Sequence, residues 1–311
     1  MDTVHFGCTR CGSCCRASIP LGLAEALDHD RDFLLALVLR AQTWNLGDFS
    51  KNQPEIPLSH DELLTTLAFR KDKLALEPSR DTVFQVGRLK SSGERVVTFM
   101  SAGAAALGVF EAGAARCARL EPDNSCRDYA HRPLACRLFP LDPLYPEMLQ
   151  NVPLRARQGR TGCDFSDQAP PLFAEGRVQD PALRQALLDR QEAIRRDSLF
   201  LPFWGRGSGR FPGLPGLSGV LEAVRGNGVM DLPLAPALVF LVAAGQLEAD
   251  RAEECLRRQC LLLEQGVAQA LARRDKAERA RTAVMRNSLD LARALTGGVG
   301  VLARELAETM N

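Results

Sequence analysis

Histidine is scarce in this chain, and large aromatic side chains are few. The 311 residues include four histidines, two tryptophans and two tyrosines. His5, His29, His60 and His131 are spread too widely along the chain to form a histidine site on their own. No Ser/His/Asp or Cys/His order typical of nucleophilic catalysis can be identified. The sequence therefore indicates no catalytic residue, and any metal site must use mainly other donors.

A surplus of charge of either sign is also missing. There are 39 basic and 38 acidic side chains, which leaves a formal net charge of +1. No lysine-rich stripe or terminal basic arm occurs, so the composition disfavours a dedicated nucleic-acid or membrane-surface protein. The arginine-rich stretches of the last third, such as ARRDKAERAR, alternate with acids and predict solvated helix faces.

Long apolar runs are absent as well. The longest, LPLAPALVFLVAAG, is too short to span a bilayer and contains Pro233 and Pro236. The first residues, MDTVHFGCTR, lack the basic segment followed by an apolar segment that marks a signal peptide. We therefore expect a cytoplasmic protein with reduced thiols, and neither a membrane nor a nucleic acid as a partner.

A phosphate-binding glycine loop is missing too. Gly103, Gly108 and Gly113 fit neither the G-x-G-x-x-G nor the Walker A spacing, and no lysine follows where a phosphate would need one. The stretch SAGAAALGVFEAGAAR is therefore predicted to be a helix or loop of small residues.

Cysteine, in contrast, is abundant. Four of the ten cysteines fall within eight residues, as Cys8, Cys11, Cys14 and Cys15 of the run FGCTRCGSCCR. A two-residue gap lets a tight loop turn successive thiols inward, and Gly12 favours close approach of the backbone to a metal. Three cysteines with this spacing hold a cubane iron–sulfur cluster when a fourth ligand comes from elsewhere, and the C-x2-C pair also occurs in structural zinc sites.

A second, looser set of thiols follows about a hundred residues later: Cys117, Cys126, Cys136 and Cys163. The eight thiols could supply one four-thiolate site with spares, or two sites. We expect the two sets to converge, because three thiols of one loop leave a four-coordinate centre short of a ligand. His131 is a further candidate ligand, although a residue in such a loop more often lies on the solvent side.

The remaining thiols differ from these eight. Cys255 and Cys260 lie in ECLRRQCLLLEQ, a predicted helix, where a spacing of five residues separates their directions by about 140°. They are predicted to be small core residues.

Positive charge accompanies the eight clustered cysteines. Neighbouring cations lower the pKa of a thiol, and thiolates are the form that binds metal. Arginine is common throughout the chain, so this pattern supports ligation without establishing it. The arginines within two residues of these cysteines are Arg10, Arg16, Arg116, Arg119, Arg127 and Arg137, against Asp128 and Asp164.

Taken together, these residues resemble the CxxCxxCC cysteine-cluster family, the YkgJ-like proteins described as zinc- or iron-chelating. The family pattern is C-x2-C-G-x-C-C, then G-x-C-x2-L, then C-x-x-Y-x2-R-P-x2-C-R-x-F-P and a final cysteine. Ala115 stands where the family usually has glycine. The resemblance covers about residues 5–170 and implies that the matching cysteines bind zinc or iron. The cysteine spacing itself favours an iron–sulfur cluster, [4Fe–4S], slightly over zinc. The matching residues are Cys8, Cys11, Gly12, Cys14, Cys15, Cys117, Leu120, Cys126, Tyr129, Arg132, Pro133, Cys136, Arg137, Phe139, Pro140 and Cys163.

The same arrangement is similar to the metal-binding part of the flagellin lysine-N-methylases, which are described as iron–sulfur, S-adenosylmethionine-dependent enzymes. This resemblance implies an alternative function, a cluster-dependent modifying enzyme such as a protein lysine N-methyltransferase. A third alternative is an interaction protein whose cysteines are simply reduced. A fold alone does not choose among these functions.

The predicted fold class is α+β. Residues 1–175 are expected to form a small cysteine-rich metal-binding domain, and residues 176–311 an all-α region that docks on this domain, covers the metal or binds a protein partner or substrate. Pro133 is expected to open a single helical turn carrying Cys136. The other N-terminal elements expected are helices over 21–42 and 59–72, the latter with a Ser59/Glu62 capping box, a β-hairpin over 81–101 and a strand over 148–157.

The region after residue 178 has a helical pattern interrupted by a glycine- and proline-rich loop. The last two of its helices are long and are expected to form an antiparallel hairpin that turns near Arg274 and Asp275. The helices predicted here cover residues 180–200, 219–226, 233–245, 247–273 and 276–309.

Overall fold

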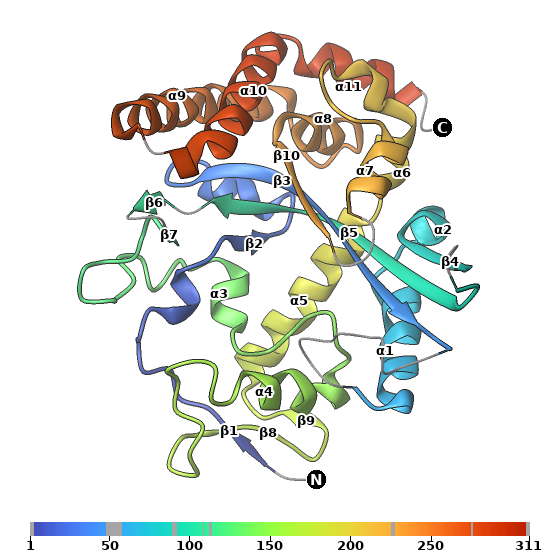
Figure 1. Ribbon diagram of the computed structural model, residues 1–311, viewed down its shortest axis with the longest axis vertical. Helices are drawn as coiled ribbons and strands as arrows, with labels where there is room; N and C mark the ends of the chain where they lie inside the picture. Colours follow the sequence, from blue (N-terminus) through green and yellow to red (C-terminus); the bar gives the residue numbers. More distant parts are fainter. Residues whose placement is uncertain are drawn as a thin grey trace.

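A long antiparallel pair of strands forms the centre of the fold (Figure 1). The computed structural model describes residues 3–47, 58–88, 92–107, 109–111, 114–224, 228–274 and 276–308. In it, β3 (Leu34–Asn45) pairs with β5 (Arg95–Leu107) along the whole length of β3. Three shorter strands complete the sheet: β10 (Val229–Pro233) pairs with β3, while β2 (Ile19–Leu21) and β4 (Phe84–Arg88) pair with opposite ends of β5.

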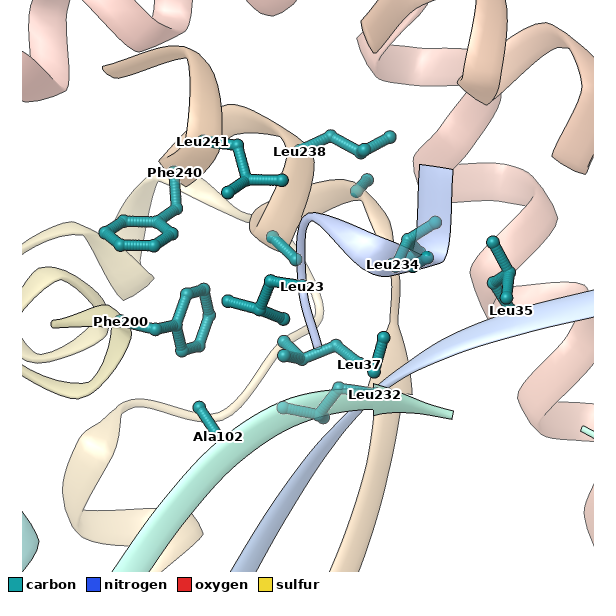
Figure 2. Packing of buried hydrophobic residues seen from close by; sticks show 14 of the residues in the cluster. Leu23, Leu35, Leu37, Ala102, Phe200, Leu232, Leu234, Leu238, Phe240 and Leu241 are labelled. Carbon is teal, nitrogen blue, oxygen red and sulfur yellow. The ribbon is translucent and has the colours of Figure 1, made fainter. Parts of the chain in front are cut away.

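The main hydrophobic core lies on one face of this sheet. Successive side chains of a strand point to opposite faces, and Leu35 and Leu37 of β3 share a face with their partners on β5, among them Ala104. Helices cover this face, and Figure 2 shows Phe200 and Phe240 from two of them beside the leucines of the sheet. The small side chains of β5 leave room for these aromatic rings.

The predicted helix over 21–42 is wrong. The chain instead forms β2, a 3-10 helix (Glu25–His29) and then β3. The run from Leu35 to Leu39 is buried on both faces of the sheet, and a continuous apolar run does not distinguish a buried strand from a buried helix. The small-residue stretch 101–116, predicted as helix or loop, also forms strands: the end of β5, then β6 (Val109–Glu111) and β7 (Ala114–Arg116), with residues 108, 112 and 113 outside the described residues. A Cβ at Gly103 would lie 3.0 Å from the Leu21 carbonyl oxygen, so glycine permits β2 to pair there.

Two of the predicted N-terminal elements are confirmed. Helix α1 (His60–Lys73) begins with the expected capping box, in which the Glu62 backbone N–H donates to Ser59 Oγ at 3.3 Å and the Ser59 N–H donates to Glu62 Oε2 at 2.8 Å. The predicted hairpin corresponds to β4 and β5, paired from Phe84–Phe99 to Arg88–Arg95; residues 89–91 of its turn lie outside the described residues. A short helix, α2 (Arg80–Val83), leads into β4.

The strand predicted over 148–157 is helical instead. A 3-10 helix (Glu147–Leu149) is followed by α4 (Asn151–Arg157). Pro153 is the third residue of α4, where a backbone N–H has no partner within the helix, so proline is tolerated there. The buried Gln150 fixes this turn, since its Nε2 donates to the carbonyl oxygens of Asp142 and Tyr145 at 2.7 and 3.1 Å.

The C-terminal region is helical, as predicted, apart from β10 and the two-residue strand β9 (Arg177–Val178) at its start. The turn near Arg274 is confirmed by a left-handed backbone there (φ 54°). The helix predicted over 276–309 is two helices, because the chain turns at Gly297 (φ 84°) and the Glu253 carboxylate accepts the N–H groups of Gly297 and Val299 at 2.6 and 2.9 Å. The helices are α5 (Pro181–Asp197), α6 (Phe200–Gly207), α7 (Leu217–Ala223), α8 (Ala235–Ala243), α9 (Ala249–Arg273), α10 (Arg279–Leu295) and α11 (Val299–Glu308).

A second, smaller core lies at the end of the molecule that holds the N-terminus (Figure 1). There β1 (Val4–His5), β8 (Pro171–Ala174) and β9 (Arg177–Val178) form a three-stranded sheet. Side chains from this sheet pack with residues of α4, α5 and α3 (Leu134–Leu138). The cysteine segments run between this small core and the large sheet, beside the two-stranded sheet of β6 (Val109–Glu111) and β7 (Ala114–Arg116).

The fold is thus mixed α+β with antiparallel sheets. The main core contains residues from both predicted domains, and β10 of the second pairs with β3 of the first. The boundary predicted between residues 175 and 176 falls in the turn between β8 and β9. The division of the chain into two separate folding units stays a prediction. Across the described ranges, no helix is both long enough and apolar enough to span a membrane.

Candidate metal centre

The N-terminal cysteine loop is shaped by two left-handed residues. Arg10 (φ 56°) and Gly12 (φ 72°) reverse the chain before a 3-10 turn (Ser13–Cys15), in which the Cys15 N–H donates to the Gly12 carbonyl at 3.0 Å. Asparagine 124 crowds this turn, because a Cβ at Gly12 would lie 3.0 Å from Asn124 Oδ1. Glycine is therefore required at position 12 both by the backbone conformation and by space.

The segment of Cys163 lies beside the first half of this loop. Gly7 and Asp164 exchange backbone hydrogen bonds of 2.7 and 2.9 Å, and Thr9 Oγ1 donates to the Gly162 carbonyl at 2.6 Å. A Cβ at Gly162 would stand 3.1 Å from Cys11 Sγ. The final cysteine of the second set is thereby held next to Cys11.

The second half of the loop contacts the segment of Cys117. The Cys117 N–H donates to the Cys15 carbonyl at 2.7 Å, so the two cysteine sets are joined by a direct main-chain hydrogen bond. Leu120 and Cys126 form an isolated β-bridge that folds the intervening residues into a compact turn. The segments of Cys15 and Cys117, which are far apart in the sequence, therefore lie side by side here.

Cys136 is placed by the helical turn predicted after Pro133. Helix α3 starts directly after this proline, and its first backbone N–H, that of Leu134, donates to Glu25 Oε1 at 2.6 Å. Glu25 Oε2 accepts the Gly22 N–H at 3.0 Å, which ties α3 to the turn after β2. Glu25 belongs to the stretch that was predicted as helix, and no sequence signal marked it as a support for Cys136.

Electrostatics link all eight clustered thiols. Burial raises the pKa of Cys136 to about 12, and negative charge on Cys117, Cys14 and Cys126 contributes to the shift. Burial also raises the pKa of Cys163, with contributions from Cys11, Cys8 and Cys14. Interactions of this kind act over short distances. The Cys117–Cys15 hydrogen bond and the contact of Gly162 with Cys11 thus bring parts of the two sets together, with Cys14 among the neighbours of both Cys136 and Cys163, while convergence on a single site stays a prediction.

The vicinal pair Cys14 and Cys15 shares a proton. Their sulfur atoms are 4.0 Å apart, and a hydrogen bond between them lowers the pKa of Cys14 to about 6 while it raises the pKa of Cys15. The charge of Arg132 adds to the effect on Cys14. One thiolate of this pair is therefore favoured, which is the state required of a metal ligand.

The donor set suits a thiophilic metal. All ten cysteines are free thiols, and sulfur-only donor sets select iron–sulfur clusters or zinc. Within the described part of the chain, however, no three Cys, His, Asp or Glu side chains are placed as the ligands of one ion. The thiols share a neighbourhood, and coordination itself stays a prediction for Cys8, Cys11, Cys14, Cys15, Cys117, Cys126, Cys136 and Cys163.

The other candidates fall outside this neighbourhood or on its rim. His131 has a side chain that is 84% exposed, and its Nδ1 pairs with Asp128 Oδ1 at 2.9 Å, which places it on the solvent side. Cys255 is buried in the main core and Cys260 packs against that core from α9, as predicted for both. Burial raises the pKa of Cys255 to about 12, so this thiol stays protonated at neutral pH.

The arginines near the thiols do not all face them. Arg116 donates to the Leu120 carbonyl at 2.8 Å and Arg16 to Asn124 at 3.3 Å. Arg119 pairs with Asp32 and Asp128. Part of the positive charge that was expected to lower the pKa of the thiols therefore serves contacts with other groups of the protein.

Arg132 lies over an exposed tyrosine beside the thiols. Its guanidinium carbon is 3.6 Å from the centre of the Tyr129 ring, and that of Arg10 is 5.4 Å from the same centre. Arg132 Nε also donates to the Tyr129 carbonyl at 3.0 Å. Tyr129 is 46% exposed, so its ring lies on the surface and not in the core.

Arg132→Ala is expected to lower metal affinity about tenfold, because groups next to metal ligands fix their orientation and charge. Arg137→Ala is the matched control, since Arg137 is an exposed arginine on the same short motif. Metal content after dialysis against a chelator, and helical circular dichroism, are the measurements. Equal metal content in both variants would remove Arg132 from the site.

Comparisons of the chain with family models, with curated proteins and with solved structures found no match. The resemblance to the cysteine-cluster family therefore rests on the motif residues themselves.

Proposed function

We propose that this protein is a metal-binding protein of the CxxCxxCC cysteine-cluster type, which holds an iron–sulfur cluster or zinc through thiolates. The observation that carries the proposal is the hydrogen bond from the Cys117 N–H to the Cys15 carbonyl, with free thiols of both sets around it. A shared thiol neighbourhood built from segments a hundred residues apart needs a reason beyond packing, since Cys8 and Cys14 are exposed.

The residues that would hold the metal are drawn from the eight clustered cysteines. A four-coordinate centre uses four of them. The C-x2-C-x2-C spacing favours [4Fe–4S], and sulfur-only donors suit zinc equally well. The bound group would supply either structural cross-linking of the two cysteine segments or redox chemistry, and in both cases its binding free energy adds to the stability of the fold.

Metal analysis of anaerobically purified protein tests this proposal. A brown protein with absorbance near about 400 nm and with iron and acid-labile sulfide indicates a cluster, whereas a colourless protein with stoichiometric zinc indicates a zinc site. Cys11→Ser should lose metal and Cys260→Ser should keep it. Protein without iron or zinc, purified without chelators, would sink the proposal.

A second candidate is the cluster-dependent modifying enzyme, which would need a cavity for its co-substrate; the structure has a cavity lined in part by Ala118. The cavity measures about 180 Å³ and lies between the ends of β3 and β5 and the helices α9 and α10. Ala118, the residue after Cys117, lines it together with Asp32, Gln265, Gln269 and Glu278. Transfer of a methyl group from S-adenosylmethionine to a protein lysine by metal-loaded protein is the discriminating assay, because a purely structural or sensory metal site gives none.

A further inference from the structure

Arg119 is a buried arginine two residues after Cys117. Its side chain is 5% exposed, and its Nη2 and Nε lie 2.5 and 3.2 Å from Asp32 Oδ2. Its Nη1 contacts Asp128 Oδ2 and the His131 carbonyl, each at 3.2 Å. The guanidinium therefore connects the start of β3 with the loop between Cys126 and Cys136.

The main chain of Arg119 makes two more contacts within the cysteine segments. Its N–H donates to Cys117 Sγ at 3.4 Å, and its carbonyl accepts the N–H of Arg127, the neighbour of Cys126, at 2.9 Å. The loop that its side chain holds leads directly to the helical turn of Cys136. One residue thus contacts the surroundings of three cysteines.

Groups around the guanidinium offset the cost of burying its charge. Two carboxylates neutralise the guanidinium, which also lies over the Phe33 ring with its central carbon 4.8 Å from the ring centre. Breaking one partner of a buried ion pair leaves the other uncompensated. Movement of the 128–131 loop relative to β3 would therefore separate the buried guanidinium from one of its carboxylates, although these carboxylates reach solvent themselves, with side chains 43% (Asp32) and 31% (Asp128) exposed.

We propose that Arg119 is a positioning residue of the metal centre, which fixes the relative positions of Cys117, Cys126 and Cys136 through its contacts with Asp32, Asp128 and Cys117 Sγ. The inference rests on the proposed metal-binding function. It assigns Arg119 a role other than ligand or counter-charge: it acts through the segments that carry the thiols.

The test compares Arg119→Gln with Arg70→Gln. Arg70 is as deeply buried, donates to Leu144 O and to Gln42 Oε1, and lies in no cysteine segment, so it matches the loss of a buried charge alone. Metal-free proteins are titrated with Zn²⁺ against a competing chelator and with Co²⁺ by absorbance. For Arg119→Gln we expect about 10- to 100-fold weaker Zn²⁺ binding and an altered Co²⁺–thiolate spectrum; for Arg70→Gln we expect wild-type affinity and spectrum.

A second measurement does not depend on metal. The alkylation rates of the buried Cys117 and the half-buried Cys126 and Cys136 in metal-free protein, followed by mass spectrometry, should rise about tenfold or more in Arg119→Gln, since local opening controls access to such thiols. They should stay unchanged in Arg70→Gln. Asp128→Ala, which keeps the Asp32 pair, should give an intermediate rise and replaces Arg119→Gln in the test if that variant does not fold.

Wild-type protein that binds neither ion would defeat the proposed function, while the alkylation rates would still decide on the positioning role of Arg119. Wild-type behaviour of Arg119→Gln, or equal changes in both arginine variants, would overturn the positioning role.

Discussion

Cys11→Ser is expected to lower the free energy of unfolding of the metal-loaded protein by on the order of 3 kcal/mol or more, because metal binding to thiolates is coupled to folding. No apolar side chain is buried in the described stretch between Gly7 and Ser18, so hydrogen bonds and surface contacts order this N-terminal loop. Its contacts with the rest of the chain include the Gly7–Asp164 backbone pair and the Cys15–Cys117 hydrogen bond, and Cys8 and Cys14 are exposed. Removal of one ligand should therefore open residues 5–20.

Thermal unfolding and limited proteolysis, each with and without a chelator, measure this effect. Chelation should lower the melting temperature of the wild-type protein and make it sensitive to protease within residues 5–20. Cys11→Ser should resemble the chelated wild-type protein. Cys260→Ser is the matched control, because it also replaces a half-buried thiol but on α9. It should cost about 1 kcal/mol or less, a packing effect. If the two substitutions were equally costly with and without chelator, the clustered cysteines would be ordinary core residues.

The sequence predicted the elements that have local chemical signals. The capping box at Ser59 and Glu62, the hairpin of β4 and β5 and the helical turn after Pro133 all depend on neighbouring residues. The strand β3 does not, because Leu35 to Leu39 are apolar on both faces and only the pairing with β5 makes them a strand. Partner strands that are sixty residues away leave no local pattern.

The candidate site, too, could be predicted only in part from the sequence. The cysteine spacing predicted which thiols belong together, and the hydrogen bond between Cys15 and Cys117 brings the two sets into contact. The supporting residues Glu25 and Asp32 could not be predicted, because acidic residues in LGLAEALDHDRDF fit the solvated face of a helix. Their partners, the Leu134 N–H and Arg119, are about a hundred residues away.

We expect the protein to lose stability as the pH rises, because of the buried carboxyl group of Asp197. This carboxylate at the end of α5 is buried, and its Oδ2 accepts the Leu23 N–H at 3.0 Å. Burial raises its pKa from 3.8 to about 7, although the nearby Arg190 acts in the opposite direction. Removal of the carboxylate from water thus outweighs its attraction to the guanidinium.

The sign follows from proton binding. Between about pH 4 and pH 7 the native state keeps the Asp197 proton and the unfolded state releases it, so unfolding becomes easier as the pH rises through this range. A difference of about three pH units corresponds to on the order of 4 kcal/mol. Below pH 4 the contribution is fully present, and above pH 7 it no longer changes.

Asp197→Asn should abolish this dependence, since an amide oxygen can still accept the Leu23 N–H and does not ionise. Urea unfolding at about pH 4.5, 6.0 and 7.5, two values between the two pKa values and one above them, measures it on metal-free protein, so that thiol ligation does not contribute. The variant should gain stability relative to wild type with each step upward in pH. Parallel curves for the two proteins would mean that Asp197 is ionised throughout, and that its attraction to the charge of Arg190 outweighs the cost of burial.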